Sequence, residues 1–268
     1  MSCHLDSILM ALWAVWCHAA LTVGNSAALF KQIFDFVATK MNSALTTTDM
    51  LNFHRDQLWT VLENAGLQDP PGMTADVNEV LRFILERIGT VALNANFEVT
   101  YTVIEHCNNC GHFVERPRMS ESYFDSNETF ALPEGVTRLY ATLSGVSRTQ
   151  ECPNCEEEQT ITYRSGVKPN HALIISNINT SFNDLETEWP LQAEHDHHRI
   201  KLVAIIVSIR GHFLCICKEP GLQWLVYDDI YGVSRNTWDN IKRIFYRSAD
   251  TSLDQTVLVV TLVYVRRQ

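Results

Sequence analysis

Two C-x-x-C pairs constrain the fold more than any other feature of this sequence. Cys107 and Cys110 form the first pair, Cys152 and Cys155 form the second, and 41 residues separate the pairs. Each pair fits a tight turn, and two such turns brought together offer four thiolates to a tetrahedral Zn²⁺ ion. Four thiolates leave no open coordination position, so the ion would be structural. We therefore predict a strand ribbon with a cysteine turn in each half.

Alternatives to this zinc site are weaker. A redox pair would explain one C-x-x-C motif but not a second copy on the returning strand. His106 and His112 flank the first pair and could act as ligands, but four cysteines already complete a site. We predict one structural zinc ion, with both histidines as neighbours and with no organic cofactor.

Charge and cysteine usage limit the partners and the compartment. A net charge of −10 argues against a nucleic-acid binder, which needs a basic surface. The eight cysteines are not spaced like a disulfide framework, which favours a reducing intracellular compartment, cytoplasmic or nuclear. The apolar run at residues 8–23 has no preceding Lys or Arg, follows Asp6 and is interrupted by His18. We therefore expect no signal peptide and no membrane partner.

The hydrophobic pattern predicts an α+β fold with helices first, then the ribbon, then a mainly antiparallel sheet. Apolar residues at helical spacing predict helices over residues 5–16, 27–41, 49–66 and 74–89. In the last of these, Thr74 is the expected N-cap and Asp76 lies in the first turn. Alternating or β-branched runs predict strands over residues 97–106, 137–143, 159–164, 171–178, 201–209, 212–218, 223–229 and 255–267. The polar segment 194–199, EHDHHR, is expected to be an exposed loop.

Cys3 stands at the start of the first predicted helix. A thiol at a helix N-terminus lies near the positive end of the helix dipole, which favours the nucleophilic thiolate. His4 is not the expected base, because adjacent helical residues point in different directions. Taken alone, a cysteine in the position of Cys3 is more often a small buried hydrophobic residue than a nucleophile.

A candidate base is His212, at the start of a predicted strand. Sixteen residues later, the next predicted strand ends in Asp228 and Asp229. A hairpin of this length brings its second end back beside its start, where a carboxylate can orient the imidazole toward a thiol. The alternative is a core histidine beside two aspartates in a turn.

These motifs, in this order, resemble those of the ubiquitin-specific protease (USP) family. Its nucleophile motif is similar to residues 3–7, CHLDS, and its second motif is similar to residues 75–85, ADVNEVLRFIL. A palm strand of the family resembles residues 168–176, KPNHALIIS. The last motif resembles Gly211-His212-Phe213, followed by Trp224 and then Tyr227-Asp228-Asp229. The resemblance runs from residue 3 to about residue 233.

The resemblance implies a papain-like cysteine protease fold of USP type, with one catalytic domain over residues 1–268. Its parts would be a helical thumb at about 1–92, zinc-binding β fingers at 93–167 and an antiparallel β palm at 168–268. It also implies Cys3 as nucleophile, His212 as general base and acid, and Asp228 as the orienting carboxylate, with Asp229 as the alternative.

The resemblance further implies a monomeric deubiquitinase, a thiol isopeptidase that cleaves after the C-terminal glycine of ubiquitin or a ubiquitin-like modifier. The variant motifs C-x-L-D-S and W-L-x-x-D-D also resemble a SUMO-cleaving branch. A catalytically inactive modifier-binding module with a structural zinc is the alternative from another class. Family members place an oxyanion-stabilising asparagine before the nucleophile. Only Met1 and Ser2 precede Cys3 here, so backbone N–H groups or upstream residues would take that role.

Overall fold

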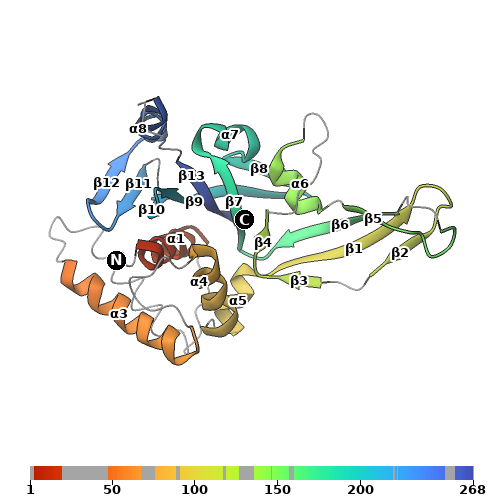
Figure 1. Ribbon diagram of the computed structural model, residues 1–268, viewed down its shortest axis with the longest axis horizontal. Helices are drawn as coiled ribbons and strands as arrows, with labels where there is room; N and C mark the ends of the chain where they lie inside the picture. Colours follow the sequence, from red (N-terminus) through yellow and green to blue (C-terminus); the bar gives the residue numbers. More distant parts are fainter. Residues whose placement is uncertain are drawn as a thin grey trace.

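Two β-sheets and the helices that cover them organise the chain in the computed structural model (Figure 1). The structure describes residues 3–19, 48–67, 76–88, 91–116, 119–126, 136–145, 147–156, 160–219, 221, 223–250 and 257–267. The mixed α and β composition predicted from the sequence is present. The helix predicted over residues 27–41 lies outside the described residues.

The larger sheet has eight strands in the order β12-β11-β10-β9-β13-β7-β4, and β8 also pairs with β9. Neighbouring strands are antiparallel, except that β4 runs parallel to β7. The strands are β4 (Phe124–Asp125), β7 (Ala172–Ser181), β8 (Gln192–His195), β9 (His198–Ile209), β10 (His212–Lys218), β11 (Trp224–Asp228), β12 (Gly232–Asn236) and β13 (Leu258–Arg266).

Helices cover both faces of this sheet. On one face, α1 (Cys3–Ala19) packs against β9, β10 and β13, with α4 (Val77–Phe83) beside it (Figure 1). The core of the other face includes residues of α7 (Leu185–Glu188) and α8 (Trp238–Asp250). Consecutive residues Ile205 and Ile206 of β9 are both fully buried and belong to opposite cores. This two-sided burial explains why the central strands are continuous apolar runs in the sequence.

Helix α1 is almost entirely enclosed. Every residue from 4 to 15 is buried, including Leu5, Leu9 and Leu12 on its apolar side. A helix that is hydrophobic on all sides is stable only inside a core. The enclosure by the sheet and by α4 holds the first turn, with Cys3, beside the start of β10. Helices α3 (Thr48–Asn64) and α5 (Val91–Phe97) complete the helical side.

The smaller sheet is a ribbon of five strands. Its two long strands pair antiparallel from Val99 opposite Pro169 to Cys107 opposite Thr160. Figure 1 shows this ribbon extending away from α1 and α4, with its base at α5. Its strands are β1 (Val99–Cys107), β2 (Phe113–Glu115), β3 (Met119–Glu121), β5 (Ser147–Gln150) and β6 (Thr160–Pro169). The subdomain boundaries at residues 92 and 167 stay predictions.

One predicted strand is wrong. Residues 137–143 were expected to form a strand, but residues 138–143 belong to helix α6 (Arg138–Ser144) and Thr137 is its N-cap residue. Alternating apolar residues over so short a segment also fit a helix, in which Leu139 and Leu143 share one buried face. Gly145 ends this helix at φ +55°, and its N–H donates to the Ala141 carbonyl at 2.8 Å.

Other boundaries also differ from expectation. The N-cap of α4 is Asp76, whose side chain accepts from the Asn78 N–H at 2.9 Å, whereas the expected cap Thr74 lies outside the described residues. Phe97 ends helix α5 instead of starting a strand, and β1 begins at Val99. The expected loop at 194–199 is a tight hairpin between β8 and β9. No helix among the described residues is both long and apolar enough to cross a bilayer.

Candidate active site

The Cys3 thiol lies at the junction of α1 and β10. It is partly buried, and the backbone N–H of Phe213, the residue after His212, donates toward its sulfur. Burial raises the pKa of the Cys3 thiol, and the negative charge of Asp229 adds to the rise. The N–H groups of Phe213 and His4 act in the opposite direction, but the net pKa remains above its ordinary value. The structure therefore favours the neutral thiol in the absence of substrate.

His212 faces two carboxylates. Its Nε2 lies 3.1 Å from Asp228 Oδ1 and 3.5 Å from Asp229 Oδ1. The hairpin of β10 and β11, paired from Lys218 opposite Trp224 to Cys215 opposite Tyr227, brings the end of β11 back beside His212. Antiparallel pairing thus places two aspartates beside a histidine sixteen residues earlier. Their roles in a reaction stay predictions.

The two aspartates are held differently. Asp228 Oδ1 accepts hydrogen bonds from the backbone N–H groups of Ile230 at 2.8 Å and Tyr231 at 3.3 Å. These backbone bonds fix the carboxylate that faces His212. Asp229 Oδ1 is buried, has no hydrogen-bond partner among the described residues, and lies 3.5 Å from His212 Nε2. Its effect on the pKa of Cys3 also places its charge near the thiol. This geometry suits Asp228 to orient the imidazole and Asp229 to act electrostatically.

The first turn of α1 also contacts β11 through a hydrogen bond. Tyr227 donates its hydroxyl to Asp6 Oδ2 across 3.5 Å, and both residues are buried. His4 is 2% exposed, and its ring packs edge-on against Trp59 with centroids 5.6 Å apart. His4 therefore belongs to the core, whereas His212, which directly precedes the Phe213 whose N–H reaches the thiol, lies in the large sheet.

The four predicted zinc ligands meet at one end of the ribbon. The Sγ atoms of Cys107 and Cys155 are 3.7 Å apart, those of Cys110 and Cys152 are 3.5 Å apart, and all four lie within 4.8 Å of one another. A tetrahedral site with Zn–S bonds of about 2.3 Å has sulfur–sulfur edges of about 3.8 Å. The four thiols therefore fit zinc closely, and the group contains no histidine.

Hydrogen bonds around this cluster favour thiolates. The Asn154 side chain donates to Cys110 Sγ at 3.6 Å, and with the His112 backbone it lowers the pKa of the Cys110 thiol to about 6. Asn109 donates to Cys155 Sγ at 3.6 Å. N–H donors to sulfur are what a cluster of thiolates around a metal requires. His106 lies in β1, and neither it nor the His112 ring is part of the cluster.

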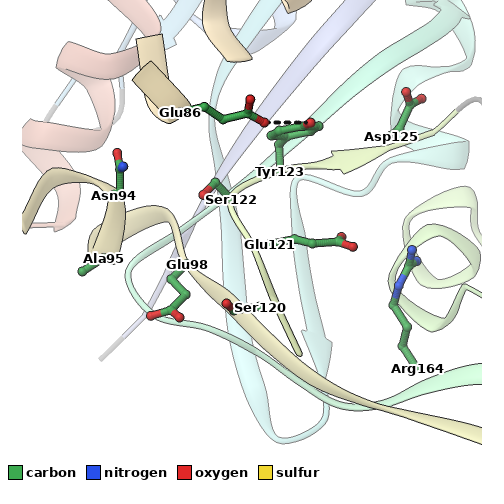
Figure 2. A pocket seen from close by; sticks show the side chains of 10 residues that line it. All are labelled: Glu86, Asn94, Ala95, Glu98, Ser120, Glu121, Ser122, Tyr123, Asp125 and Arg164. Atoms are coloured by element: carbon green, nitrogen blue, oxygen red, sulfur yellow. Dashed lines mark hydrogen bonds between the residues drawn. The ribbon is translucent and has the colours of Figure 1, made fainter. Parts of the chain in front are cut away.

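A cavity of about 650 Å³ opens where the base of the ribbon meets α5 and the residues after α4 (Figure 2). Arg164 contributes a cation to its wall and is held by a 3.0 Å hydrogen bond to the Thr142 carbonyl. Tyr123 donates to Glu86 across 3.2 Å. The carboxylates that line the cavity are Glu86, Glu98, Glu121 and Asp125. Four acids around one guanidinium make the cavity attractive to a basic group.

The fold is similar to that of a deubiquitinase module of known structure. Among the solved structures that match the whole chain are the SAGA DUB module of Ubp8, Sgf11, Sus1 and Sgf73 bound to monoubiquitin and the Ubp8/Sgf11/Sus1/Sgf73 module bound to ubiquitin aldehyde. The TM-score is 0.57 for both, with 14% and 15% sequence identity. The chain spans 66% and 67% of the lengths of the matched chains. No family model matches the sequence. At this identity the likeness shows a USP-like fold.

Sequence reasoning missed three contributors to the site. The Phe213 N–H depends on backbone geometry, which residue types do not reveal. The link between Asp6 and Tyr227 joins residues 221 positions apart. The turn that carries Ile230 and Tyr231 did leave a signal, because two large apolar residues are unusual in a tight hairpin.

Proposed function

We propose that this chain is a thiol isopeptidase that removes ubiquitin from lysine side chains. The single observation that carries the proposal is the convergence of three elements. The N-terminus of α1 brings Cys3 to the Phe213 N–H, and the hairpin of β10 and β11 holds His212 3.1 Å from Asp228. A thiol, an imidazole and an orienting carboxylate are the parts of a cysteine protease. The deubiquitinase fold supports this reaction class.

In the first step, the proton of Cys3 passes to His212 and the thiolate attacks the carbonyl carbon of the modifier's C-terminal glycine. A C–S bond forms as the C–N bond to the lysine breaks, and His212 gives its proton to the leaving amine. Water then attacks the thioester carbonyl as His212 takes its proton, the C–S bond breaks, and His212 returns the proton to the Cys3 sulfur. The products are the modifier carboxylate and the restored thiol. Asp228 orients the imidazole throughout.

Backbone N–H groups at the start of α1 are the proposed oxyanion donors. The His4 N–H already points toward the Cys3 sulfur, and unpaired N–H groups at a helix N-terminus favour developing negative charge. This assignment needs no side-chain donor before Cys3.

The four cysteines of the ribbon would hold one structural zinc ion. When bound, zinc would cross-link the two cysteine turns and would supply no catalytic chemistry. A ribbon closed at its tip keeps a fixed surface for the modifier. The acidic cavity at the base of the ribbon supports a modifier with basic side chains.

Ubiquitin is the modifier that we favour, because the two similar structures described above are deubiquitinase modules, one bound to monoubiquitin and the other to ubiquitin aldehyde. SUMO remains the alternative modifier, and the zinc-containing module without catalysis is the alternative function. The raised pKa of Cys3 is the observation that favours the inactive module. We further propose that the chain acts as a monomer in the cytosol or nucleus.

Parallel reactions with electrophilic probes test the proposal. Ubiquitin and SUMO, each with a C-terminal vinyl sulfone, are incubated with the protein and with its Cys3→Ala variant. Covalent capture of ubiquitin that is lost in Cys3→Ala supports the proposal. Capture of SUMO alone would reassign the modifier, and binding of ubiquitin without capture would favour the inactive module.

A further inference from the structure

The turn between β11 and β12 carries an exposed apolar tip. Residues 229–231 join Asp228 to its strand partner Gly232. Ile230 is 57% exposed, Tyr231 is 87% exposed, and nearby Val233 is 38% exposed. Turns this tight favour Gly, Asn and Asp, and a β-branched residue such as isoleucine is disfavoured there. Three exposed apolar residues within four positions of one tight turn are more typical of a contact surface than of scattered surface residues.

This tip is fixed relative to the proposed base. Asp228 Oδ1 lies 3.1 Å from His212 Nε2. The same oxygen accepts hydrogen bonds from the backbone N–H groups of Ile230 and Tyr231. The carboxylate therefore holds the imidazole with one contact and the turn with two. The apolar side chains are thus presented beside the histidine by a backbone already ordered, which lowers the entropic cost of binding.

The tip and the acidic cavity lie at opposite edges of the large sheet. The sheet begins with β12 and ends with β4, whose Asp125 lines the cavity (Figures 1 and 2). His212 and Asp228 belong to β10 and β11, next to the β12 edge. A modifier bound at the ribbon and cavity would reach the thiol from the β4 side. The polypeptide attached to its C-terminus would then leave across the β12 side.

We infer that the turn of residues 229–232 docks the polypeptide that carries the modified lysine, with Ile230 and Tyr231 contacting apolar side chains next to that lysine. The inference rests on the proposed function. It concerns the polypeptide part of the conjugate, whereas the proposed function concerns the modifier. A patch of three side chains is too small for a stable dimer, which needs an interface above about 1,000 Å². It suits a short extended segment, and an exposed tyrosine offers a large contact with few rotatable bonds.

Two substrates with the same modifier separate this role from the chemistry. One is ubiquitin 7-amido-4-methylcoumarin, and the other is ubiquitin joined by an isopeptide bond to the lysine of a peptide with leucine on both sides. The variants are Tyr231→Ser and Ile230→Ser. The matched control is Ile244→Ser, which changes an isoleucine of α8 that is 49% exposed. In each test variant, kcat/KM for the peptide conjugate should fall about tenfold relative to that for the coumarin amide. In the control, this ratio should equal that of the unmodified protein.

A binding measurement gives a readout without turnover. In a Cys3→Ala background, the peptide conjugate should bind more tightly than free ubiquitin, and Tyr231→Ser should remove that difference. If kcat/KM falls equally on both substrates, the turn contacts the modifier and not the peptide, and the inference is overturned. If the ratio of kcat/KM for the two substrates stays the same in Tyr231→Ser, the inference is also overturned. Loss of a dimer in Tyr231→Ser, seen by sedimentation with this ratio unchanged, would assign the turn to self-association instead. Failure of the unmodified protein to cleave the coumarin amide would refute the proposed function itself, and the inference with it.

Discussion

His212 Nε2 lies 3.1 Å from Asp228 Oδ1, an oxygen that two backbone N–H groups of the next turn also hold. Asp229 lies farther from the ring, at 3.5 Å. Asp228 is thus the better-fixed partner for the imidazole, and the two carboxylates should differ in mutational effect.

Replacement of Asp228 by Ala should lower kcat on a fluorogenic ubiquitin amide by on the order of a thousandfold, with little change in KM, because the imidazole loses its orientation. Asp229→Ala should lower kcat by less than about a hundredfold, a tenth of the loss expected for Asp228→Ala. Steady-state kinetics of both variants measure the comparison, with circular dichroism to check folding. A larger loss in Asp229→Ala would transfer the orienting role to Asp229.

The reactivity of Cys3 should increase into alkaline pH. Burial and the nearby carboxylates raise the pKa of its thiol above the ordinary value of 9.0, so little thiolate exists at pH 7 and more forms as the pH rises through 9. Iodoacetamide alkylation, followed by mass spectrometry of the Cys3 peptide, should therefore accelerate up to and beyond pH 9. Cys17, whose pKa is raised to about 11, is the internal comparison and should react more slowly. A rate that is constant from pH 5 to 8 would instead reveal a preformed thiolate–imidazolium pair.

Removal of the Asp229 charge should make Cys3 more acidic. The carboxylate raises the pKa of the thiol by repelling the thiolate, so Asp229→Asn should move the alkylation profile of Cys3 to lower pH. Asp239→Asn, which removes an exposed carboxylate from α8, should leave the profile unchanged. If both variants behave like the unmodified protein, Asp229 does not act on the thiol.

Zinc should bind to the ribbon in a ratio of one ion per chain. Elemental analysis of the purified protein should find one zinc, and Cys107→Ser or Cys152→Ser should lower that content severalfold, because three thiolates bind more weakly than four. Cys17→Ser, which changes a cysteine outside the ribbon, should retain the metal. Chelation should accelerate amide hydrogen exchange in β1 and β6 more than in β9 and β13. Full zinc content in Cys107→Ser would exclude Cys107 as a ligand.

A chain of polar side chains, buried at Thr261 and Asn78, joins α4 to the large sheet and should contribute to stability. Thr261 donates to Asn78 at 2.6 Å, Asn78 donates to Asn177 at 2.9 Å, and Asn177 donates to Asp125 at 2.8 Å. Asn78→Ala should lower the free energy of unfolding by about 2 kcal/mol, because buried partners lose their hydrogen bonds. Urea denaturation measures the change. Asn240→Ala, at an exposed position of α8, should change it by less than about 0.5 kcal/mol.

Much of the fold was predictable from local pattern. Five strands of the large sheet, β7, β9, β10, β11 and β13, follow from β-branched and aromatic runs, and α1 follows from apolar residues at helical spacing. The short strands β4, β8 and β12 were not predicted. The strand predicted over residues 137–143 was wrong because a short alternation of Leu and Ala fits either a strand or a helix. The start of α4 was misplaced because Thr74 and Asp76 are both good caps, and only the hydrogen bond to Asn78 decides between them.

For the candidate site, the sequence by itself determined which chemistry is available. It placed a thiol at a helix start, a histidine and two aspartates at the ends of one hairpin, and four cysteines in two turns, since these depend on residue type and short-range spacing. Tertiary structure decided the rest. Packing of α1 against β10 sets the Phe213 N–H beside Cys3, buries the thiol enough to raise its pKa and brings the Asp229 charge near it. Such effects depend on burial and on distances between segments some two hundred residues apart, which no local pattern encodes.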